Sequence, residues 1–298
     1  MMLWSFLNYI MLKFSKDSRK KLIAIGCSYT DDWNNRSRIP PEKRFPSWPH
    51  LLAETLDMQC INLGRSGAGN DEILSNLIDT VLNQKNIGLV VIMWSEWQRI
   101  SFQMRYRRPS EWWHVNTMRK AGECWLEHVA RSRWIPDFQL SVDEWAPNLL
   151  GAINPHHSCQ TALRNFILAQ NLLKDIPYLF IQGPAAMTYY NVKTLKYIDC
   201  SQDGPNGESI DFYRTNNSRQ QTAIFLTNSP YLKHIETNRF IGWPIFAELG
   251  GYNVDDMLDK IDPKRTRTRI GPDDTHPNRV GYEIITQEIY NAYEKVYT

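Results

Sequence analysis

Four short apolar runs in this chain are separated by segments whose apolar residues recur at helical spacing. The runs are residues 22–25, 59–63, 88–94 and 178–182, and helical spacing covers residues 49–56, 71–82, 161–174 and 279–297. Strands that alternate with helices of this length predict βαβ units, in which helices cover a parallel sheet. The chain has 298 residues, of which 42% are hydrophobic, so it can bury the core that such an α/β fold needs.

Two long stretches, about 100–159 and about 185–262, lack clean periodicity and interrupt this pattern. The first contains Trp112, Trp113, Trp125, Trp134 and Trp145, and the second includes a polar section at 200–221. We expect both to be loop insertions that rise over the carboxyl edge of the sheet and shape a substrate pocket. The chain has no internal repeat and no linker of Pro, Ser or Gly, so residues 21–298 are predicted to form a single domain.

Residues 1–14 are mostly apolar, and their polar side chains fall near one stripe of a helical wheel. We expect residues 1–20 to form an amphipathic helix and a basic linker, with the helix packed on the domain or on a partner chain rather than on a membrane surface. The basic residues follow the apolar stretch, which is the wrong order for a secretory signal, and the stretch is too short to span a bilayer. The expected location is therefore the cytoplasm.

Ser28 follows the first apolar run and is the first candidate for chemistry. Gly26 ends the run and lets the backbone turn sharply, which presents Ser28 at the carboxyl edge of the sheet, where open α/β sheets place their active sites. A serine hydroxyl is a weak nucleophile until a base removes its proton, and His276, which follows Asp273 and Asp274, has the chemistry of that base. The alternative is a turn serine, two solvated aspartates and a histidine at a helix start.

The run Gly26-Cys27-Ser28 and the run Asp273-Asp274-Thr275-His276-Pro277 resemble the first and last blocks of the SGNH (GDSL-like) hydrolases. The resemblance implies a three-layer α/β/α flavodoxin-like fold and an esterase that forms an acyl-enzyme without metal or cofactor. It implies that Ser28 is the nucleophile and His276 the base. The acidic member of that family stands three residues before the histidine, which is Asp273 here, whereas Asp274 is one residue out of register.

The oxyanion-binding residues match this family only in part. The run 62–70 resembles its second block and makes Gly67 the expected backbone donor. Where the family has Gly-x-Asn-Asp after its third strand, this chain has Trp94-Ser95-Glu96, so the oxyanion asparagine is missing. Loss of one such donor costs about 100- to 1,000-fold in turnover. Asn70 or Ser95 is a candidate replacement, although Asn70 is favoured more as the N-cap of the next helix.

Tryptophans indicate the substrate class. Trp33, Trp112 and Trp113 fall in segments predicted to be loops, so we expect them to line the pocket above Ser28, where indole rings can stack on sugars. The alternative for any single tryptophan is a place in the core. The expected substrate is an ester of a small molecule or a glycan, including O-acetyl groups. One alternative is a protein without catalytic activity that binds carbohydrate or has a structural role, for example in a virion if the chain comes from a bacteriophage. Another alternative is an acyltransferase.

Charge and metal-ligating residues point to no other function. The formal net charge is +2, which gives no bulk attraction to nucleic acid, and the basic runs 105–108 and 264–269 are favoured as solvated faces over contacts with an anionic polymer. His156 and His157 are expected in a loop, because no histidine or cysteine cluster with zinc spacing accompanies them. Five cysteines at irregular spacing form no disulfide framework, which indicates a reducing compartment or buried thiols.

Overall fold

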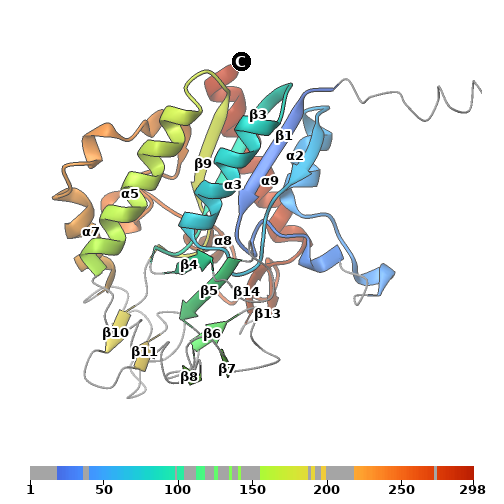
Figure 1. Cartoon of the computed structure of the whole chain (residues 1–298). Helices are drawn as coiled ribbons and strands as arrows, with labels where there is room; N and C mark the ends of the chain where they lie inside the picture. The colour runs from blue at the N-terminus through green and yellow to red at the C-terminus, as the bar shows by residue number, and fades with distance from the viewer. Residues whose placement is uncertain are drawn as a thin grey trace, which may run out of the picture.

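The computed structural model describes residues 19–35, 40–97, 99–103, 112–117, 124–126, 134–135, 140–141, 155–186, 189–191, 196–198, 218–271 and 274–298 (Figure 1). The predicted N-terminal helix lies outside these residues, and so does Asp273.

A five-stranded parallel sheet forms the centre of the molecule. Its strands are β1 (Lys21–Gly26), β2 (Gln59–Asn62), β3 (Ile87–Trp94), β9 (Tyr178–Gln182) and β12 (Phe240–Ile241). They pair in the order β12-β9-β3-β1-β2, and every pair is parallel. Counted along the chain this is the order 2-1-3-4-5 of flavodoxin-like folds. The predicted α/β fold with a central parallel sheet is confirmed.

Helices cover both faces of the sheet. Those on one side are α3 (Asn70–Asn83), α5 (Pro155–Leu172) and α7 (Ser218–Thr227), and those on the other are α2 (Trp48–Thr55), α8 (Val254–Ile261) and α9 (Arg279–Tyr297). Because strand side chains alternate, Ile23 and Ile25 join the core under α3 and α5, whereas Leu22 and Ala24 join the core under α2 and α9. This double burial explains why the strands are continuous apolar runs.

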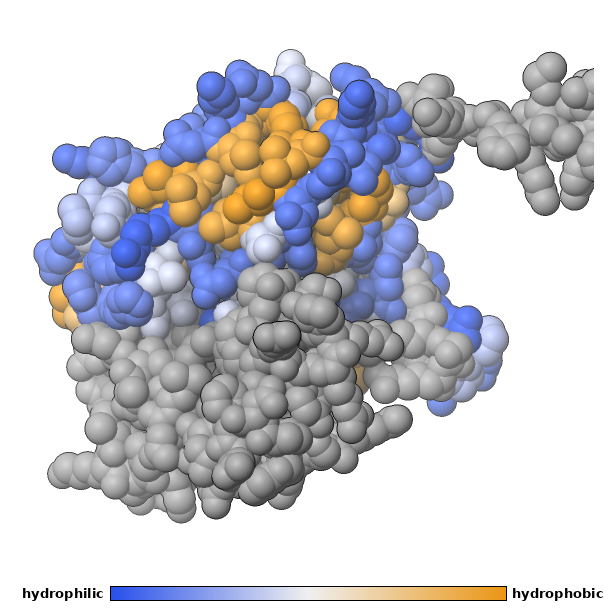
Figure 2. Space-filling view, in the orientation of Figure 1, coloured by the Kyte–Doolittle hydropathy of each residue, from blue (hydrophilic) through white to orange (hydrophobic). Residues whose placement is uncertain are grey.

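The outer surface of α3 and α5 carries an apolar area, drawn in orange in Figure 2. The exposed side chains there include Ile78 and Leu82 of α3 and Leu168 of α5.

The described residues of the first insertion that precede α5 form small antiparallel sheets. Its strands are β4 (Ile100–Gln103), β5 (Trp112–Thr117) and β6 (Cys124–Leu126) in one sheet, with β7 (Trp134–Ile135) and β8 (Leu140–Ser141) in another. Trp112 and Trp113 lie in β5, opposite Gln103 and Phe102 of β4, so their prediction as loop residues is wrong. Aromatic residues favour strands, and a strand of consecutive tryptophans shows no apolar–polar alternation. The structure describes the backbone of these two tryptophans but not their side chains.

The second insertion contributes in part to the core. It contains the small hairpin β10 (Tyr189–Asn191) and β11 (Lys196–Ile198), followed by α7, β12 and α8. Leu226, Ile241, Val254 and Leu258 are buried, so the prediction that all of 185–262 lies outside the core is wrong for residues 218–261. The sequence signal is weak because β12 has two residues and α8 has eight. Both are shorter than the window of residues over which a periodic pattern can be recognised.

Short elements complete the described fold. Three-residue 3-10 helices lie at Trp33–Asn35, Pro41–Lys43, Leu232–His234, Thr237–Arg239 and Ala247–Leu249. The antiparallel hairpin of β13 (Arg269–Gly271) and β14 (Asp274–Pro277) comes directly before α9. This hairpin carries His276.

Candidate active site

The turn after β1 presents Ser28 at the carboxyl edge of the sheet. The N–H groups of Thr30 and Asp31 donate to the carbonyl of Cys27 at 2.9 and 3.0 Å, which closes a tight turn around Ser28. A Cβ on Gly26 would lie 2.8 Å from the carbonyl oxygen of Met93, so this position requires glycine. Ser28 is half-buried at the turn, and the neighbouring Cys27 thiol is fully buried.

The loop after β2 packs directly against this turn. Asn62 donates from Nδ2 to the carbonyl of Thr30 at 2.8 Å, and Asp31 accepts a hydrogen bond from the N–H of Ser66 at 3.0 Å. Gly67 follows with φ +85°, a left-handed conformation that favours glycine. Within the described part of the chain, the N–H groups of Ser28 and Gly67 have no hydrogen-bond acceptor. Two backbone donors of the kind that an oxyanion needs are therefore unused at this edge.

His276 lies beside the residue that follows Ser28. The hydroxyl of Tyr29 donates to the carbonyl of Thr275 at 2.9 Å, and the ring centroids of Tyr29 and His276 are 5.5 Å apart. The structure therefore brings together the two segments that carry the motifs. No hydrogen bond joins Ser28 Oγ to the His276 imidazole, two residues that the structure describes. Catalytic hydrogen bonds are often long without substrate.

A carboxylate fixes one nitrogen of the His276 ring. Oδ1 of Asp274 lies 2.6 Å from Nδ1 of His276 and also accepts the His276 backbone N–H at 3.0 Å. A carboxylate only accepts hydrogen bonds, so Nδ1 carries the proton and Nε2 is the basic nitrogen of the neutral ring. The role that the resemblance gives to Asp273 is untested, because this residue lies outside the described chain, and the described contact supports Asp274 for that role.

Trp33 also lies at His276. Its ring is 5.6 Å from the imidazole centroid to centroid, at 66° between the ring planes. Trp33 begins a short 3-10 helix, and its side chain is partly exposed. A place near the site is thus observed for Trp33, and its contact with a substrate stays a prediction.

The two candidate replacements for the missing asparagine contact one another. Asn70 accepts the Ser95 N–H at 2.8 Å and donates from Nδ2 to the Ser95 carbonyl at 3.3 Å, so it links the start of α3 to the end of β3. The N-cap of α3 is Gly69, so the alternative of Asn70 as N-cap is wrong. Ser95 Oγ is buried and has no hydrogen-bond partner within the described residues. A role of either side chain in oxyanion binding stays a prediction.

A second imidazole–carboxylate pair lies next to Trp33 and has no signal in the sequence. His50 Nε2 is 3.0 Å from Asp32 Oδ2, and Ser47 donates to Asp32 Oδ1 at 2.5 Å. The hydrogen bond with Asp32 raises the pKa of His50 to about 10. Burial on its own would raise the pKa of Asp32, but the hydrogen bonds from His50 and Ser47 outweigh it and lower that pKa. His50 is therefore protonated at neutral pH and is a poor general base, which leaves His276 for that task.

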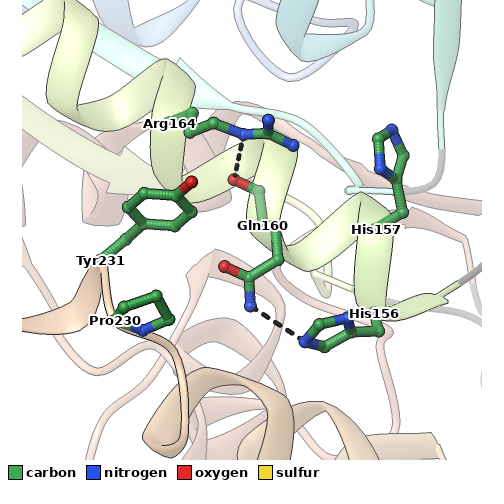
Figure 3. A pocket seen from close by; sticks show the side chains of 6 residues that line it. All are labelled: His156, His157, Gln160, Arg164, Pro230 and Tyr231. Atoms are coloured by element: carbon green, nitrogen blue, oxygen red, sulfur yellow. Dashed lines mark hydrogen bonds between the residues drawn. The ribbon is translucent and has the colours of Figure 1, made fainter.

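An open pocket of about 460 Å³ lies at the start of α5 and contains none of the predicted catalytic residues. Figure 3 shows its lining side chains, which are His156, His157, Gln160, Arg164, Pro230 and Tyr231. Gln160 Nε2 lies 3.2 Å from His156 Nε2, and the Arg164 guanidinium lies 5.9 Å from the centre of the Tyr231 ring. Both histidines lie in α5, so their prediction as loop residues is wrong. Pro155 favours a helix start at that point.

The described residues contain no group of three or more His, Cys, Asp and Glu side chains that could hold a metal ion. None of their helices has the length and apolar character needed to cross a membrane.

Comparison with known proteins adds structural neighbours. No family model matches the chain, and a search of curated proteins finds no significant match. Among solved structures, a member of the lipolytic protein G-D-S-L family from Veillonella parvula is 11% identical, with a TM-score of 0.40 over 93% of this chain and 100% of that chain. An acetyl xylan esterase from Geobacillus stearothermophilus is 13% identical, with a TM-score of 0.40 over 92% of this chain and 94% of that chain.

A third neighbour is AlinE4, an SGNH-hydrolase family esterase, which is 14% identical with a TM-score of 0.36 over 95% of this chain and 100% of that chain. Two of these three structures carry the GDSL or SGNH family name. It is the family that the sequence motifs resemble. At these identities and TM-scores the matches assign no activity to this chain.

Proposed function

We propose that this chain is a serine esterase of the SGNH type, which hydrolyses a carboxylic ester through an acyl-enzyme. The observation that carries the proposal is the placement of His276. Its ring packs against Tyr29, the residue after Ser28, while Asp274 holds its Nδ1 atom at 2.6 Å. A serine in a tight turn, an imidazole beside that turn and a carboxylate on one nitrogen of the imidazole are the parts of an acyl-transfer site.

Each residue has a separate task in this mechanism. Ser28 Oγ attacks the acyl carbon while His276 Nε2 takes the serine proton and returns it to the leaving alcohol. Asp274 keeps the ring in the required tautomer and stabilises its charged form. Water then attacks the acyl-enzyme with His276 again as base, which releases the acid and restores Ser28.

The oxyanion is bound at the edge where the turn and the β2 loop meet. The unused N–H groups of Ser28 and Gly67 are its backbone donors in this proposal. Asn70 supplies the third donor through the second hydrogen of its Nδ2 group, the first being directed at Ser95. No metal or organic cofactor takes part in this proposed reaction.

The substrate proposed is an ester with a flat or ring-shaped alcohol, such as an O-acetylated sugar. Trp33 supports it, because a partly exposed indole beside the catalytic imidazole offers a stacking surface next to the reacting bond. The competing function is carbohydrate binding without catalysis. The observation in its favour is the missing hydrogen bond between Ser28 and His276.

Hydrolysis of a short-chain p-nitrophenyl ester separates the two functions. We expect turnover by the wild type and loss to a similar floor in Ser28→Ala, in His276→Ala and in the double variant, because members of a catalytic unit are not additive. Cys27→Ala is the matched control, because it changes the buried neighbour of Ser28 and should retain activity. A wild type without turnover, or activity that survives Ser28→Ala and is lost in Cys27→Ala, would contradict the proposal.

A further inference from the structure

A cluster of charges joins α8 to the hairpin that carries His276, with Arg269 and Asp255 buried and Arg265 and Asp259 partly buried. Arg269, the first residue of β13, is 1% exposed, and its Nη2 atom is 2.9 Å from Asp255 Oδ1 and 3.2 Å from Asp259 Oδ1. Arg265 pairs with both oxygens of Asp259 at 3.1 and 2.7 Å. Two guanidinium groups therefore face two carboxylates from α8, and opposite charges are matched within this cluster.

Asp255 connects three loops at the carboxyl edge of the sheet. Its Oδ1 atom accepts the Tyr29 hydroxyl at 2.8 Å and Arg269 at 2.9 Å, and its Oδ2 atom accepts the N–H of Ala185 at 3.0 Å. Tyr29 lies in the turn after β1, Ala185 follows β9, and Arg269 begins the hairpin. One carboxylate thus fixes the Ser28 turn and the His276 hairpin relative to each other.

Both donors also reach the peptide group next to His276. The carbonyl of Thr275 accepts from Nη1 of Arg269 at 2.5 Å and shares the single hydroxyl hydrogen of Tyr29 with Asp255 Oδ1, these two oxygens lying 2.9 and 2.8 Å from the phenol oxygen. Thr275 lies between Asp274 and His276, so these bonds hold the backbone from which both proposed catalytic side chains extend.

Stability is a weak explanation for such a network. Burying ion pairs costs desolvation that roughly cancels the attraction between the charges, and well-packed apolar residues often serve equally well. What an apolar cluster cannot supply is direction, because hydrogen bonds to a carbonyl fix its position and the contact of apolar groups does not.

We propose that Tyr29 and Arg269 are positioning residues that set the orientation of the His276 imidazole by holding the Thr275 carbonyl, with Asp255 aligning both donors. This inference rests on the proposed esterase function for its kinetic test. It concerns the geometry of His276 and can also be tested without a substrate.

Tyr29→Phe is the sharpest variant, because it keeps the ring that packs on His276 and removes the hydroxyl alone. A small displacement of a catalytic group can cost on the order of 100-fold, so we expect kcat to fall by roughly 10- to 100-fold with little change in KM. Tyr178→Phe is the matched control, since this buried hydroxyl donates to Glu236 at 2.8 Å within a different part of the fold. Arg269→Lys should keep the positive charge but lose the simultaneous contacts with Asp255 and the Thr275 carbonyl. It should therefore lower kcat in the same way.

Nitrogen-15 NMR of the imidazole tests the geometry directly. The His276 signals are assigned by their loss in His276→Asn, and we expect the Nδ1 and Nε2 shifts to change in Tyr29→Phe and Arg269→Lys and to stay constant in Tyr178→Phe. Changed shifts in a protein without esterase activity would support the positioning role while the proposed function fails. Unchanged His276 shifts in both variants, with circular dichroism showing that both are folded, would overturn the inference.

Discussion

The Tyr29 hydroxyl lies 2.9 Å from the Thr275 carbonyl oxygen, and this hydrogen bond joins residues 246 positions apart. It places the turn that presents Ser28 against the hairpin that presents His276. The contact explains in physical terms how two motifs at opposite ends of the chain can serve one site.

The acidic partner of His276 is tested by two asparagine variants. Asp274→Asn removes the charge 2.6 Å from Nδ1 and permits the wrong tautomer, which in a serine protease lowers kcat about 10⁴-fold. We expect kcat to fall at least about 1,000-fold in Asp274→Asn and less than about tenfold in Asp273→Asn. Ester hydrolysis at pH 8 gives the comparison, and a larger loss in Asp273→Asn would transfer the role to the residue that the family register predicts.

Asn70 is expected to serve both stability and turnover. Asn70→Ala leaves the Ser95 N–H without its acceptor, while the Ser95 carbonyl keeps the bond from Gln182 Nε2 at 2.9 Å, and this loss should lower the free energy of unfolding by about 1–3 kcal/mol in urea titrations. Asn70→Asp retains an acceptor for Ser95 but loses the Nδ2 donor, so kcat should fall on the order of 100-fold.

The control for Asn70 is Asn165→Ala. Asn165 is also buried and donates from Nδ2 to Asp71 at 3.1 Å, but it lies on α5. The Asn165→Ala variant should have a lower free energy of unfolding and an unchanged kcat. Full activity in Asn70→Asp would exclude Asn70 from oxyanion binding.

Trp33 is expected to act on bulky substrates. Trp33→Ala should raise KM for an acetylated polysaccharide by about tenfold, because a stacking surface worth roughly 1 kcal/mol or more is lost. Turnover of a small p-nitrophenyl ester should change much less, and Trp33→Phe should restore most of the binding. Equal losses on both substrates would show that Trp33 only supports the His276 ring, 5.6 Å away.

The pair of His50 and Asp32 predicts a dependence of stability on pH. The pKa of His50 is raised to about 10 in the folded protein, above its ordinary value of 6.5, so protonation favours folding. The stabilisation is fully present below pH 6.5 and disappears as the pH rises through 10. Both side chains are more than a third exposed, so we expect about 1 kcal/mol or less.

Urea unfolding at pH 6 and pH 10 measures this effect. The wild type should exceed His50→Gln in free energy of unfolding at pH 6, and the difference should nearly vanish at pH 10. Asp32→Asn should lower the free energy of unfolding at pH 6 by a similar amount, and this loss should also nearly vanish at pH 10. A difference that grows with pH would refute the assigned ion pair.

The fold was predictable where long apolar runs carried the signal. The four strands and four helices expected from periodicity are present within a few residues, except that α5 begins earlier, at Pro155. The strand β12 has two residues and follows a polar section, so no run marked it. Trp112 and Trp113 lie in a strand because pairing with β4, and not local periodicity, decides their conformation.

The residues of the candidate site were predictable where adjacent residues formed a motif. Ser28 and His276 could be paired because each lies in a recognisable local run. The Asp32–His50 pair and the Asp255–Arg269 network could not, because their members come from separate elements and only tertiary packing brings them together.

The central claim is that Ser28 is an activated nucleophile, and covalent labelling tests it most directly. The protein is incubated with a fluorophosphonate, digested, and analysed by mass spectrometry to locate the adduct. We predict one phosphonyl group on Ser28, with labelling slowed at least about 100-fold in His276→Ala because the base is lost. An unlabelled protein, or an adduct on Cys27 or another residue with Ser28 unmodified, would contradict the account.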